Sequence, residues 1–295
     1  MQKTKIIPVI TAVLLLLAGC MSANKYHISN AVVPEIIELQ YPVVMVHGIA
    51  RNDTHKMYKP WGRIPAILKM HGVNVYFGYT DAWGDIESNA ELLKATIDRV
   101  LLETQKPKVN IIAHSKGGLD SRYMIWNYNY GNKVASLTTI ASPHNGSEIA
   151  DLLYDRDTLF TKWLKKRIKF YAKVFKDHNP DVFMVTYQLT THHMEEFNEK
   201  VTLSDNVYFQ CFYSIMDDPY HHPRFTISCK YLDKLTGAND GVVSEKSAKF
   251  TPCSTRIPGS LSHEQIIDQQ HRKDLRMIIP NIYLEIVNEL AIMGF

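Results

Sequence analysis

Ser115 lies in a turn whose residue types suit a nucleophile. It stands within residues 113–118 (AHSKGG), between an apolar run typical of a strand and a stretch typical of a helix. A serine on such a strand-to-helix turn needs small neighbours because the backbone is crowded, and the turn holds its hydroxyl above the sheet edge. Ala113 replaces the first glycine of the usual motif, a small-for-small change. We therefore predict a nucleophilic Ser115, against the alternative of a chance serine in a glycine-rich turn.

A serine hydroxyl needs two further side chains to react near neutral pH. An imidazole takes its proton, and a carboxylate holds that imidazole in the correct tautomer. After a turn of this kind the expected chain order is serine, acid, histidine. Asp240 lies in a tight turn, residues 237–243 (GANDGVV), and His263 follows in residues 260–264 (SLSHE). The sequence therefore predicts Asp240 as the acid and His263 as the base.

Four other side chains compete for these two roles. Asp217 and Asp218 follow a predicted strand and are the stronger rivals for the acid, whereas Asp233 has no glycine turn around it. His271 also follows the acid, but it stands in the charged stretch HRKDLR, which predicts a surface position. The glycine turn around the preferred acid favours it over these rivals.

The chemistry also needs hydrogen-bond donors for the negative oxygen that forms on an attacked carbonyl. One donor is the backbone N–H of the residue after the nucleophile, Lys116. The other is expected in the loop after the first core strand, where residues 47–49 (HGI) make the Ile49 N–H the candidate. We expect the His47 side chain to support that loop, and a metal-binding role for it is the less favoured alternative.

Alternating strands and helices must position these residues. Apolar runs predict strands at residues 41–47, 73–79, 109–113, 134–140 and 207–215. Helical patterns begin at a capping-box signature, residues 88–91 (SNAE), and at Gly117, and a further one covers residues 276–293. This alternation predicts an α/β fold with a mostly parallel central sheet and helices on both faces, over residues 41–295.

An insertion at about residues 151–200 interrupts this alternation. Within it, residues 159–176 place apolar side chains at helical spacing among many lysines, which predicts a basic amphipathic helix. A surface helix packed on the sheet and a mobile lid that meets a lipid surface are both open interpretations. The basic face suits anionic headgroups, so this segment is a candidate membrane contact.

The first 19 residues have the pattern of an export signal. Two lysines precede an apolar stretch, residues 6–17, that is too short to span a bilayer comfortably. The residues that follow, Ala18 and Gly19, are small and lead to Cys20. This ending resembles the lipobox of bacterial lipoproteins, in which the cysteine is acylated and becomes the new N-terminus.

We therefore predict a signal peptide over residues 1–19, a lipidated Cys20 and a tether over residues 20–40. The protein would be an exported bacterial lipoprotein that is anchored to a membrane of the cell envelope, with an outer membrane or the cell surface as the open choices. An ordinary secretory signal with an incidental cysteine is the alternative.

Charge and cysteine content bound the partners of the chain. The net charge is only +3 and no long basic tract with interleaved aromatic residues occurs, so we expect no nucleic-acid partner. Export favours one disulfide among Cys211, Cys229 and Cys253, and all three pairings stay open. The histidine pairs at 192–193 and 221–222 lack the carboxylate or cysteine spacing of a zinc site, so we expect no metal there.

The combination of these motifs resembles the bacterial triacylglycerol lipases of the α/β-hydrolase superfamily, the group that includes the Pseudomonas and Burkholderia lipases. The matching segments are 41–49 (YPVVMVHGI), 109–123 (VNIIAHSKGGLDSRY), 137–151 (LTTIASPHNGSEIAD), 237–243 (GANDGVV) and 262–265 (SHEQ). The resemblance implies an α/β-hydrolase fold with a helical lid insertion. It also implies hydrolysis of carboxylic esters of lipids through an acyl-enzyme, with a lipid or ester substrate and no cofactor.

The resemblance assigns Ser115 as nucleophile, Asp240 as acid, His263 as base, and Ile49 and Lys116 as oxyanion donors. A phospholipase, a thioesterase or an acyltransferase on envelope lipids is the alternative that keeps this triad. A non-catalytic, lipid-binding lipoprotein is the less favoured alternative from another class.

Two departures from this family concern its structural elements. The related lipases bind a structural calcium through an aspartate two positions after the catalytic histidine, and this chain has Gln265 there. The second calcium carboxylate would correspond to Asp217 or Asp218, so calcium binding stays an open alternative. The family's disulfide places a cysteine shortly after the acid loop, whereas Cys253 stands further along this chain.

Overall fold

The computed structural model of the protein describes residues 35–53, 59–155, 177–178, 180–252, 254–269, 275 and 278–295. Several sequence predictions lie outside these residues: the signal peptide, the lipidated Cys20, most of the tether, the amphipathic segment 159–176, Cys253 and His271. The described residues contain the whole predicted sheet and every residue that was assigned to the reaction.

Six strands form one parallel sheet in the order β2-β1-β3-β4-β5-β6. Their bounds are β1 Val43–Val46, β2 Val75–Phe77, β3 Val109–His114, β4 Val134–Ile140, β5 Tyr208–Ile215 and β6 Thr255–Ser260. Every residue of β1, β3 and β4 is buried, as expected for strands that are covered on both faces. The carboxyl ends of parallel strands meet at one edge of the sheet, and ligand sites of open α/β sheets lie there.

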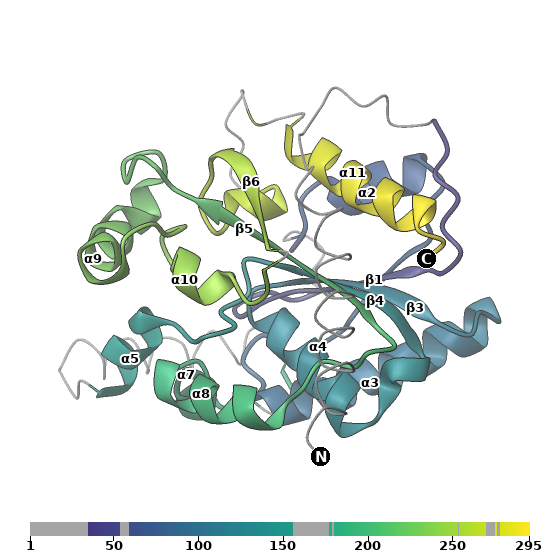
Figure 1. Ribbon diagram of the computed structural model, residues 1–295, viewed down its shortest axis with the longest axis horizontal. Coiled ribbons are helices and arrows are strands. Elements are labelled where there is room, and N and C mark those ends of the chain that lie inside the picture. The colour runs from purple at the N-terminus through teal and green to yellow at the C-terminus, as the bar shows by residue number, and fades with distance from the viewer. Residues whose placement is uncertain are drawn as a thin grey trace, which may run out of the picture.

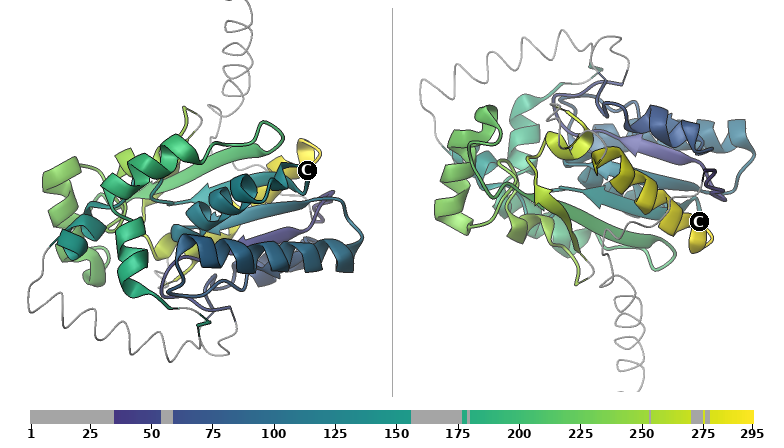
Figure 2. Two further views of the ribbon diagram at one scale, coloured as in Figure 1. Left: turned by 90° about the horizontal axis from the view of Figure 1, so that it is seen from below. Right: turned by 90° about the horizontal axis from the view of Figure 1, so that it is seen from above.

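Helices cover both faces of the sheet (Figures 1 and 2). The α-helices are α2 Ile64–Met70, α3 Ile86–Thr104, α4 Lys116–Asn127, α5 Glu148–Asp155, α7 Val182–Gln188, α8 Thr191–Lys200, α9 Thr226–Thr236, α10 Glu245–Ala248 and α11 Ile278–Ile292. The short 3-10 helices are η1 Tyr130–Asn132, η2 Pro223–Phe225 and η3 Gln265–Ile267. Helices α2 and α11 cover one face, and α3 and α4 cover the other (Figure 1).

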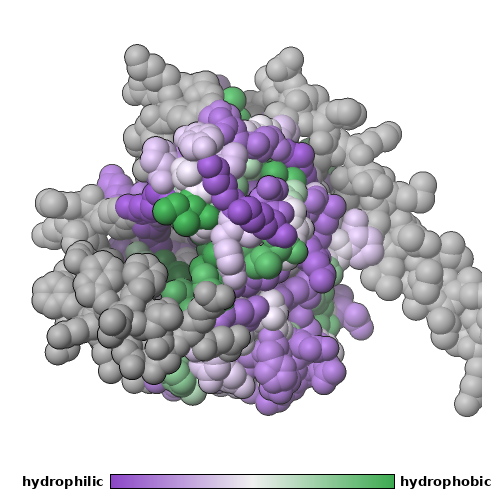
Figure 3. Space-filling model, turned by 90° about the vertical axis from the view of Figure 1, so that its left-hand side faces the viewer, coloured by the Kyte–Doolittle hydropathy of each residue, from purple (hydrophilic) through white to green (hydrophobic). Residues whose placement is uncertain are grey.

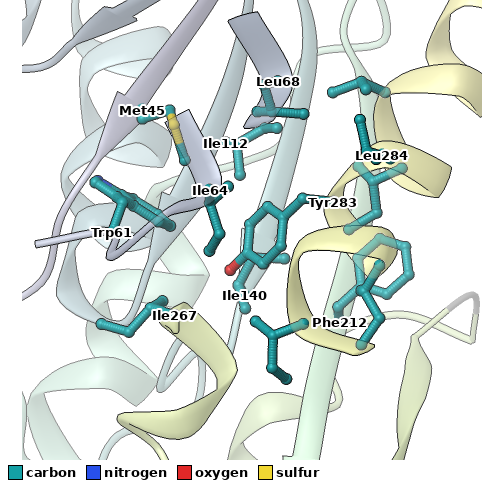
Figure 4. Packing of buried hydrophobic residues seen from close by; sticks show 14 of the residues in the cluster. Met45, Trp61, Ile64, Leu68, Ile112, Ile140, Phe212, Ile267, Tyr283 and Leu284 are labelled. Carbon is teal, nitrogen blue, oxygen red and sulfur yellow. The ribbon is translucent and has the colours of Figure 1, made fainter. Parts of the chain in front are cut away.

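Successive side chains of a strand point to opposite faces, so each strand supplies both sides of the core. Val43 and Met45 of β1 pack with α2 and α11, whereas Val44 and Val46 pack with α3 and α4. On the α11 side, Tyr283 lies fully buried among aliphatic and aromatic residues that include Trp61 (Figure 4), and its hydroxyl donates to the Ile266 carbonyl at 3.0 Å. Because Ile266 belongs to the loop after β6, this bond fixes that loop to the core.

The structure corrects three expectations about the elements. The first is the capping box, because α3 begins at Ile86 and Asp85 is its N-cap, whose carboxylate accepts from the Ser88 N–H at 2.7 Å. The second concerns β6, which lies at the edge of the sheet and buries only Ile257, so no apolar run marked it. The third concerns the helix expected over residues 276–293 apart from Pro280: α11 includes Pro280 in its first turn, where the missing N–H costs no intrahelical bond.

The predicted α/β architecture is confirmed, with helices on both faces and a sheet whose described strands are all parallel. The region of the expected insertion contains α5, α7 and α8, with residues 156–176 outside the described part. Among the described residues, no helix combines the length and the apolar character needed to cross a bilayer.

Candidate active site

The turn between β3 and α4 holds Ser115 in a strained conformation. Its φ is 54° and its ψ is −130°, a region that residues with a side chain rarely adopt. The Ser115 N–H donates to the Ile140 carbonyl of β4 at 2.9 Å, which fixes the turn to the sheet. Glycine is required just after it, because a Cβ on Gly117 would lie 2.5 Å from the His47 carbonyl oxygen. The predicted setting of Ser115 is therefore present.

The imidazole of His263 lies between Ser115 and Asp240. Its Nε2 is 2.9 Å from the Ser115 Oγ, and its Nδ1 is 2.7 Å from the Asp240 Oδ2. A carboxylate only accepts hydrogen bonds, so Nδ1 carries the proton and Nε2 is free to accept from the serine hydroxyl. All three side chains are buried. The structure thus brings together three residues from three separate parts of the chain in an order suited to proton transfer from serine to histidine.

Asp240 is oriented by the backbone of its own turn. Its Oδ1 accepts from the N–H groups of Val242 and Val243 at 2.9 and 2.8 Å, which leaves Oδ2 for His263. The Asp240 carbonyl also accepts from the His263 N–H at 2.9 Å. The glycine turn therefore holds the carboxylate close to the segment after β6 that carries His263, residues 261–269, which we call the histidine loop. This explains why a turn of this kind is a useful sequence signal.

The rival acids lie elsewhere. Asp217 and Asp218 are not buried: Asp217 pairs with Arg256 at 2.9 Å, and Asp218 lies 3.3 Å from the His221 imidazole. Asp233 is exposed on α9. Among the described residues, the carboxylate bound to the His263 ring is that of Asp240 and none of these three.

The two expected oxyanion donors lie beside the serine turn. Lys116 is the first residue of α4, and the N–H of a first helical residue has no partner within the helix. Gly48 packs directly on the serine, because a Cβ on it would lie 2.7 Å from the Ser115 Cβ. In the described part of the chain, no group accepts the Ile49 N–H, which follows Gly48. Within the described ranges, neither the Lys116 N–H nor the Ile49 N–H has a backbone acceptor, so both can donate to a ligand oxygen.

His47 supports the loop that carries Gly48 and Ile49. Its ring nitrogens lie 2.8 Å from the Gly48 carbonyl oxygen and 3.1 Å from the Thr80 carbonyl oxygen. The Asp53 carboxylate lies 3.8 Å from Nε2, and burial raises the pKa of Asp53 while His47 acts in the opposite direction. These contacts join the loop after β1 to the loop after β2, the supporting role that the sequence predicts for His47.

A buried ion pair next to the serine turn was not predicted from the sequence. The Lys116 ammonium donates to the Asp120 carboxylate at 2.6 Å, and Asn89 of α3 donates to the same carboxylate at 3.1 Å. Burial raises the pKa of Asp120 to about 6, although Lys116 and Asn89 both favour its ionised form. The spacing of Lys116 and Asp120 on one helix could have indicated this pair, but only the fold shows that it is buried.

His114, immediately before the nucleophile, is a second residue that sequence reasoning missed. Its ring is fully buried, and its Nε2 lies 3.1 Å from the His263 carbonyl oxygen, to which it donates. Burial lowers the pKa of His114 well below its usual value, and nearby His263 adds to this effect. A neutral His114 therefore anchors the histidine loop to the end of β3.

The residues that correspond to the calcium ligands of the related lipases do not fit that role here. Gln265 supplies a neutral amide whose oxygen accepts from the Ser262 N–H at 3.0 Å. Asp217 is bound by the Arg256 guanidinium. Across the described ranges, no three His, Cys, Asp or Glu side chains gather into a group that could hold a metal ion. We therefore derive no step that involves a metal.

The expected disulfide is not formed by Cys211 or Cys229, which are both buried free thiols. Cys211 belongs to β5 and lies 3.8 Å from the His144 ring, and Cys229 belongs to α9 and contacts the Met216 carbonyl. The two thiols have separate partners on different elements. The disulfide expected among the three cysteines, with its pairing left open, is therefore wrong, because every possible pairing includes one of these two free thiols. Burial raises the pKa of both, so they stay protonated near neutral pH.

Known proteins resemble this chain in sequence. The profile of the family described as palmitoyl protein thioesterase matches residues 42–250. The triacylglycerol lipase 2 of Saccharomyces cerevisiae is 30% identical over 256 residues, which cover 80% of this chain and 74% of the yeast protein. The triacylglycerol lipase of Pseudarthrobacter phenanthrenivorans is 39% identical over 120 residues, 39% of this chain and 37% of that protein. That of Burkholderia plantarii is also 39% identical over 120 residues, and the match spans 33% of its length.

Solved structures share the fold. The mature lipase BlEst2 of Bacillus licheniformis superposes with a TM-score of 0.63 at 23% identity, over 86% of this chain and 93% of that one. A metagenomic carboxyl esterase superposes with a TM-score of 0.65 at 15% identity, over 90% of this chain and 78% of that one. The predicted α/β-hydrolase fold and the resemblance to triacylglycerol lipases are both confirmed. The chain belongs to the palmitoyl protein thioesterase family, within the α/β-hydrolases, and is a relative of the triacylglycerol lipases.

Proposed function

We propose that the protein hydrolyses carboxylic esters of lipids through an acyl-enzyme formed on Ser115. The observation that carries this proposal is the hydrogen-bonded chain from the Ser115 Oγ through the His263 ring to the Asp240 carboxylate. The strained turn at Ser115 supports it, because backbone strain of this kind persists where it positions a reacting group.

In the proposed mechanism, His263 Nε2 takes the Ser115 proton as Oγ attacks the ester carbonyl. Asp240 stabilises the imidazolium that forms, and the N–H groups of Ile49 and Lys116 bind the oxyanion. The alcohol leaves with the proton from His263, so the imidazole becomes neutral again. Water then attacks the acyl-enzyme by the same route and releases the fatty acid.

The names of the relatives favour two classes of acyl substrate. Several of them bear the name triacylglycerol lipase, which favours an oxygen ester of a lipid. The family profile bears the name palmitoyl protein thioesterase, and this favours a long-chain thioester as the second candidate. Both substrates pass through the same acyl-enzyme and differ only in the leaving group.

The decisive experiment compares these leaving groups on one enzyme. A soluble form that begins at Ser22 is assayed on p-nitrophenyl esters from acetate to palmitate and on an S-palmitoyl peptide, beside Ser115→Ala. Ester hydrolysis that rises with chain length and is lost in the variant supports the lipase proposal. Preference for the peptide thioester supports the second candidate. No turnover, together with no labelling by a fluorophosphonate probe, would refute both and leave a lipid-binding protein.

We further propose that the protein is a lipoprotein of the bacterial cell envelope, anchored through Cys20. The lipobox-like ending of residues 17–20 supports this proposal. Full-length protein and Cys20→Ala are expressed with radiolabelled palmitate and separated into membrane and soluble fractions. Label and membrane association in the parent alone are the expected result, and unlabelled parent protein in the soluble fraction would contradict the anchor.

A contact between the enzyme and a lipid surface is part of the same proposal. The side of the molecule with α5, α7 and α9 is mainly hydrophilic, with hydrophobic side chains gathered near its middle (Figure 3). Exposed apolar residues on α7 and α9 include Phe183, Met184, Ile227 and Leu235. Substituting Ile227 and Leu235 by serine should weaken binding of the soluble form to phospholipid vesicles while hydrolysis of p-nitrophenyl butyrate stays unchanged. Unchanged vesicle binding would contradict this contact.

A further inference from the structure

The residue after the histidine, Glu264, joins parts of the molecule that are far apart in the sequence. Its side chain is 11% exposed, and its Oε1 accepts from the Arg51 Nη2 and from the Arg224 Nη1, each at 2.7 Å. Arg51 is as well buried as Glu264, whereas 62% of the Arg224 side chain is exposed. One carboxylate oxygen therefore accepts hydrogen bonds from two guanidinium groups, one buried and one exposed.

The buried half of this contact connects two loops that the reaction needs. Arg51 follows closely after Ile49, in the loop that presents an oxyanion donor, and Glu264 directly follows His263. Burial lowers the pKa of Arg51, and the Glu264 carboxylate works against this by favouring the charged guanidinium. Removing Glu264 takes from the buried Arg51 guanidinium the carboxylate that binds it, and removing Arg51 leaves Glu264 with only the exposed Arg224 as a guanidinium partner. Breaking a buried ion pair is much more unfavourable than breaking an exposed one.

The exposed half connects the same carboxylate to η2, the short helix between β5 and α9. The next residue of η2, Phe225, packs on the turn that carries the acid, because a Cβ on Gly241 would lie 2.7 Å from the Phe225 Cβ. The buried His222 ring lies 3.7 Å from the other Glu264 oxygen. The oxyanion loop, the histidine loop and η2 therefore meet at Glu264.

We propose that Arg51 and Glu264 are positioning residues, whose ion pair fixes the oxyanion loop relative to the His263 loop. Neither side chain is needed to touch the substrate. The pair acts through the placement of the Ile49 N–H and of the His263 ring, which must both face the same reacting carbonyl. This inference rests on the proposed function of the triad.

The proposal predicts a loss in kcat rather than in KM. The reaction needs the attacked carbonyl to lie in reach of the base and of the oxyanion donors at once, and a misplacement of about 1 Å can lower the rate about 100-fold. Acyl-chain binding in the ground state does not depend on that alignment. We therefore expect Arg51→Gln and Glu264→Gln to lower kcat by about 10- to 100-fold, with KM within about twofold of the parent.

The structure offers two matched controls. Arg63 binds Asp268, at the far end of the histidine loop, through its Nε at 2.8 Å, and this pair joins residues as distant in sequence as Arg51 and Glu264. Arg63→Gln should therefore loosen the same loop away from the reaction centre, with kcat within about threefold of the parent. Arg224→Gln removes only the exposed guanidinium and should have a similarly small effect, because exposed ion pairs contribute little.

The experiment measures kcat and KM on p-nitrophenyl butyrate for the soluble parent, the four single variants and the double variant Arg51→Gln/Glu264→Gln. Circular dichroism and urea unfolding first establish the folded fraction, and the rates are expressed per folded molecule. Because both substitutions break the same ion pair, the kcat of the double variant should lie within about twofold of that of the slower single variant. The rate of labelling by a fluorophosphonate probe should fall in parallel, since this reaction also needs the aligned serine.

Three results would overturn the proposal: a kcat within about twofold of the parent in folded Arg51→Gln, a loss in Arg63→Gln as large as that in Arg51→Gln, or multiplied losses in the double variant. Failure of the proposed function has a different signature, because the parent itself would then hydrolyse no ester and take up no probe. A parent that is active beside equally active Arg51→Gln and Glu264→Gln variants refutes only the positioning role.

Discussion

Helices α3 and α4 each carry a lysine that is followed by an aspartate at i+4, and the two pairs lie in opposite surroundings. Lys94 and Asp98 of α3 are 3.0 Å apart with side chains 36% and 37% exposed. Lys116 and Asp120 of α4 are 2.6 Å apart with side chains 2% and 1% exposed. The residue types and the spacing are identical, so burial alone separates a surface ion pair from one that supports the serine turn.

The pKa values of the two aspartates are shifted in opposite directions, although burial acts to raise both. Slight burial works to raise the pKa of Asp98, but hydrogen bonds from Lys133, Tyr130 and Lys94 outweigh it and lower that pKa to about 2. For Asp120, complete burial outweighs Lys116 and Asn89 and raises the pKa to about 6. Both ion pairs favour the charged carboxylate, but only at Asp98, where water still solvates the side chain, does this outweigh the cost of burial. Breaking the buried pair would leave a desolvated charge behind, so it is more costly to break than the exposed pair.

The largest effect is expected where a buried carboxylate takes part in the proposed reaction itself. Asp240→Asn keeps the size of the side chain but favours the wrong tautomer of His263, so kcat should fall by about 10⁴-fold. Hydrolysis of p-nitrophenyl butyrate measures this loss. The comparison variant, Asp98→Asn, should keep the activity of the parent, and a loss below about tenfold in Asp240→Asn would contradict the assigned role.

The next effect tests the matched pairs directly. Asp120→Ala leaves the Lys116 ammonium buried without a counter-charge, so the free energy of unfolding should fall by about 3–5 kcal/mol. Asp98→Ala removes an exposed partner and should lower it by about 0.2–1 kcal/mol. Urea unfolding of both variants measures the two costs. Equal costs would show that burial is not what distinguishes the pairs.

The double variant Lys116→Met/Asp120→Leu provides the control for this prediction. Because it replaces both charges by apolar groups, its free energy of unfolding should lie closer to that of the parent than that of Asp120→Ala. A double variant as unstable as the single one would assign the cost to lost packing rather than to an unpaired charge.

A smaller effect is expected at His114, a buried neutral group that acts through a single hydrogen bond. His114→Leu removes the donor to the His263 carbonyl and should lower kcat by about tenfold, the equivalent of about 1.4 kcal/mol. His71, whose side chain takes no part in the site described here, serves as the matched histidine in His71→Leu. Steady-state kinetics on p-nitrophenyl butyrate compares the two, and equal rates would show that β3 does not need this bond to hold the histidine loop.

The smallest effect is a difference in pH dependence between the two aspartates. The pKa of Asp98 in the folded protein lies below its ordinary value of 3.8, so the ionised carboxylate stabilises the fold above about pH 4. This contribution to the free energy of unfolding is lost as the pH falls toward 2. The folded pKa of Asp120 lies above 3.8, so its ionisation opposes folding and its contribution declines as the pH rises from about 4 to 6.

Urea unfolding of the parent, Asp98→Asn and Asp120→Asn across pH 2–7 measures these opposite trends. The stability that the parent has over Asp98→Asn should shrink as the pH falls toward 2. Relative to Asp120→Asn, the parent should instead lose stability as the pH rises from about 4 to 6. Two differences that follow the same trend would contradict the contrast between the pairs.

Sequence patterns predicted the parts of this protein that depend on local chemistry. Apolar runs located five of the six described strands, because strands covered on both faces must be apolar throughout. The glycine turns around Ser115 and Asp240 were recognisable because a strained or tight backbone restricts which residues fit. The resemblance to lipases rested on these same turns, which the structure brings together through His263.

Tertiary structure alone decided which charged and polar residues are buried. Lys94 and Lys116 have the same neighbour at the same spacing, and nothing local distinguishes them. The Arg51–Glu264 contact joins residues that are 213 positions apart in the sequence, and the contact from His114 to the His263 carbonyl joins residues 149 positions apart. Local sequence determines backbone conformation, but the burial of a side chain depends on what the rest of the chain packs against it, and that appears only in the folded molecule.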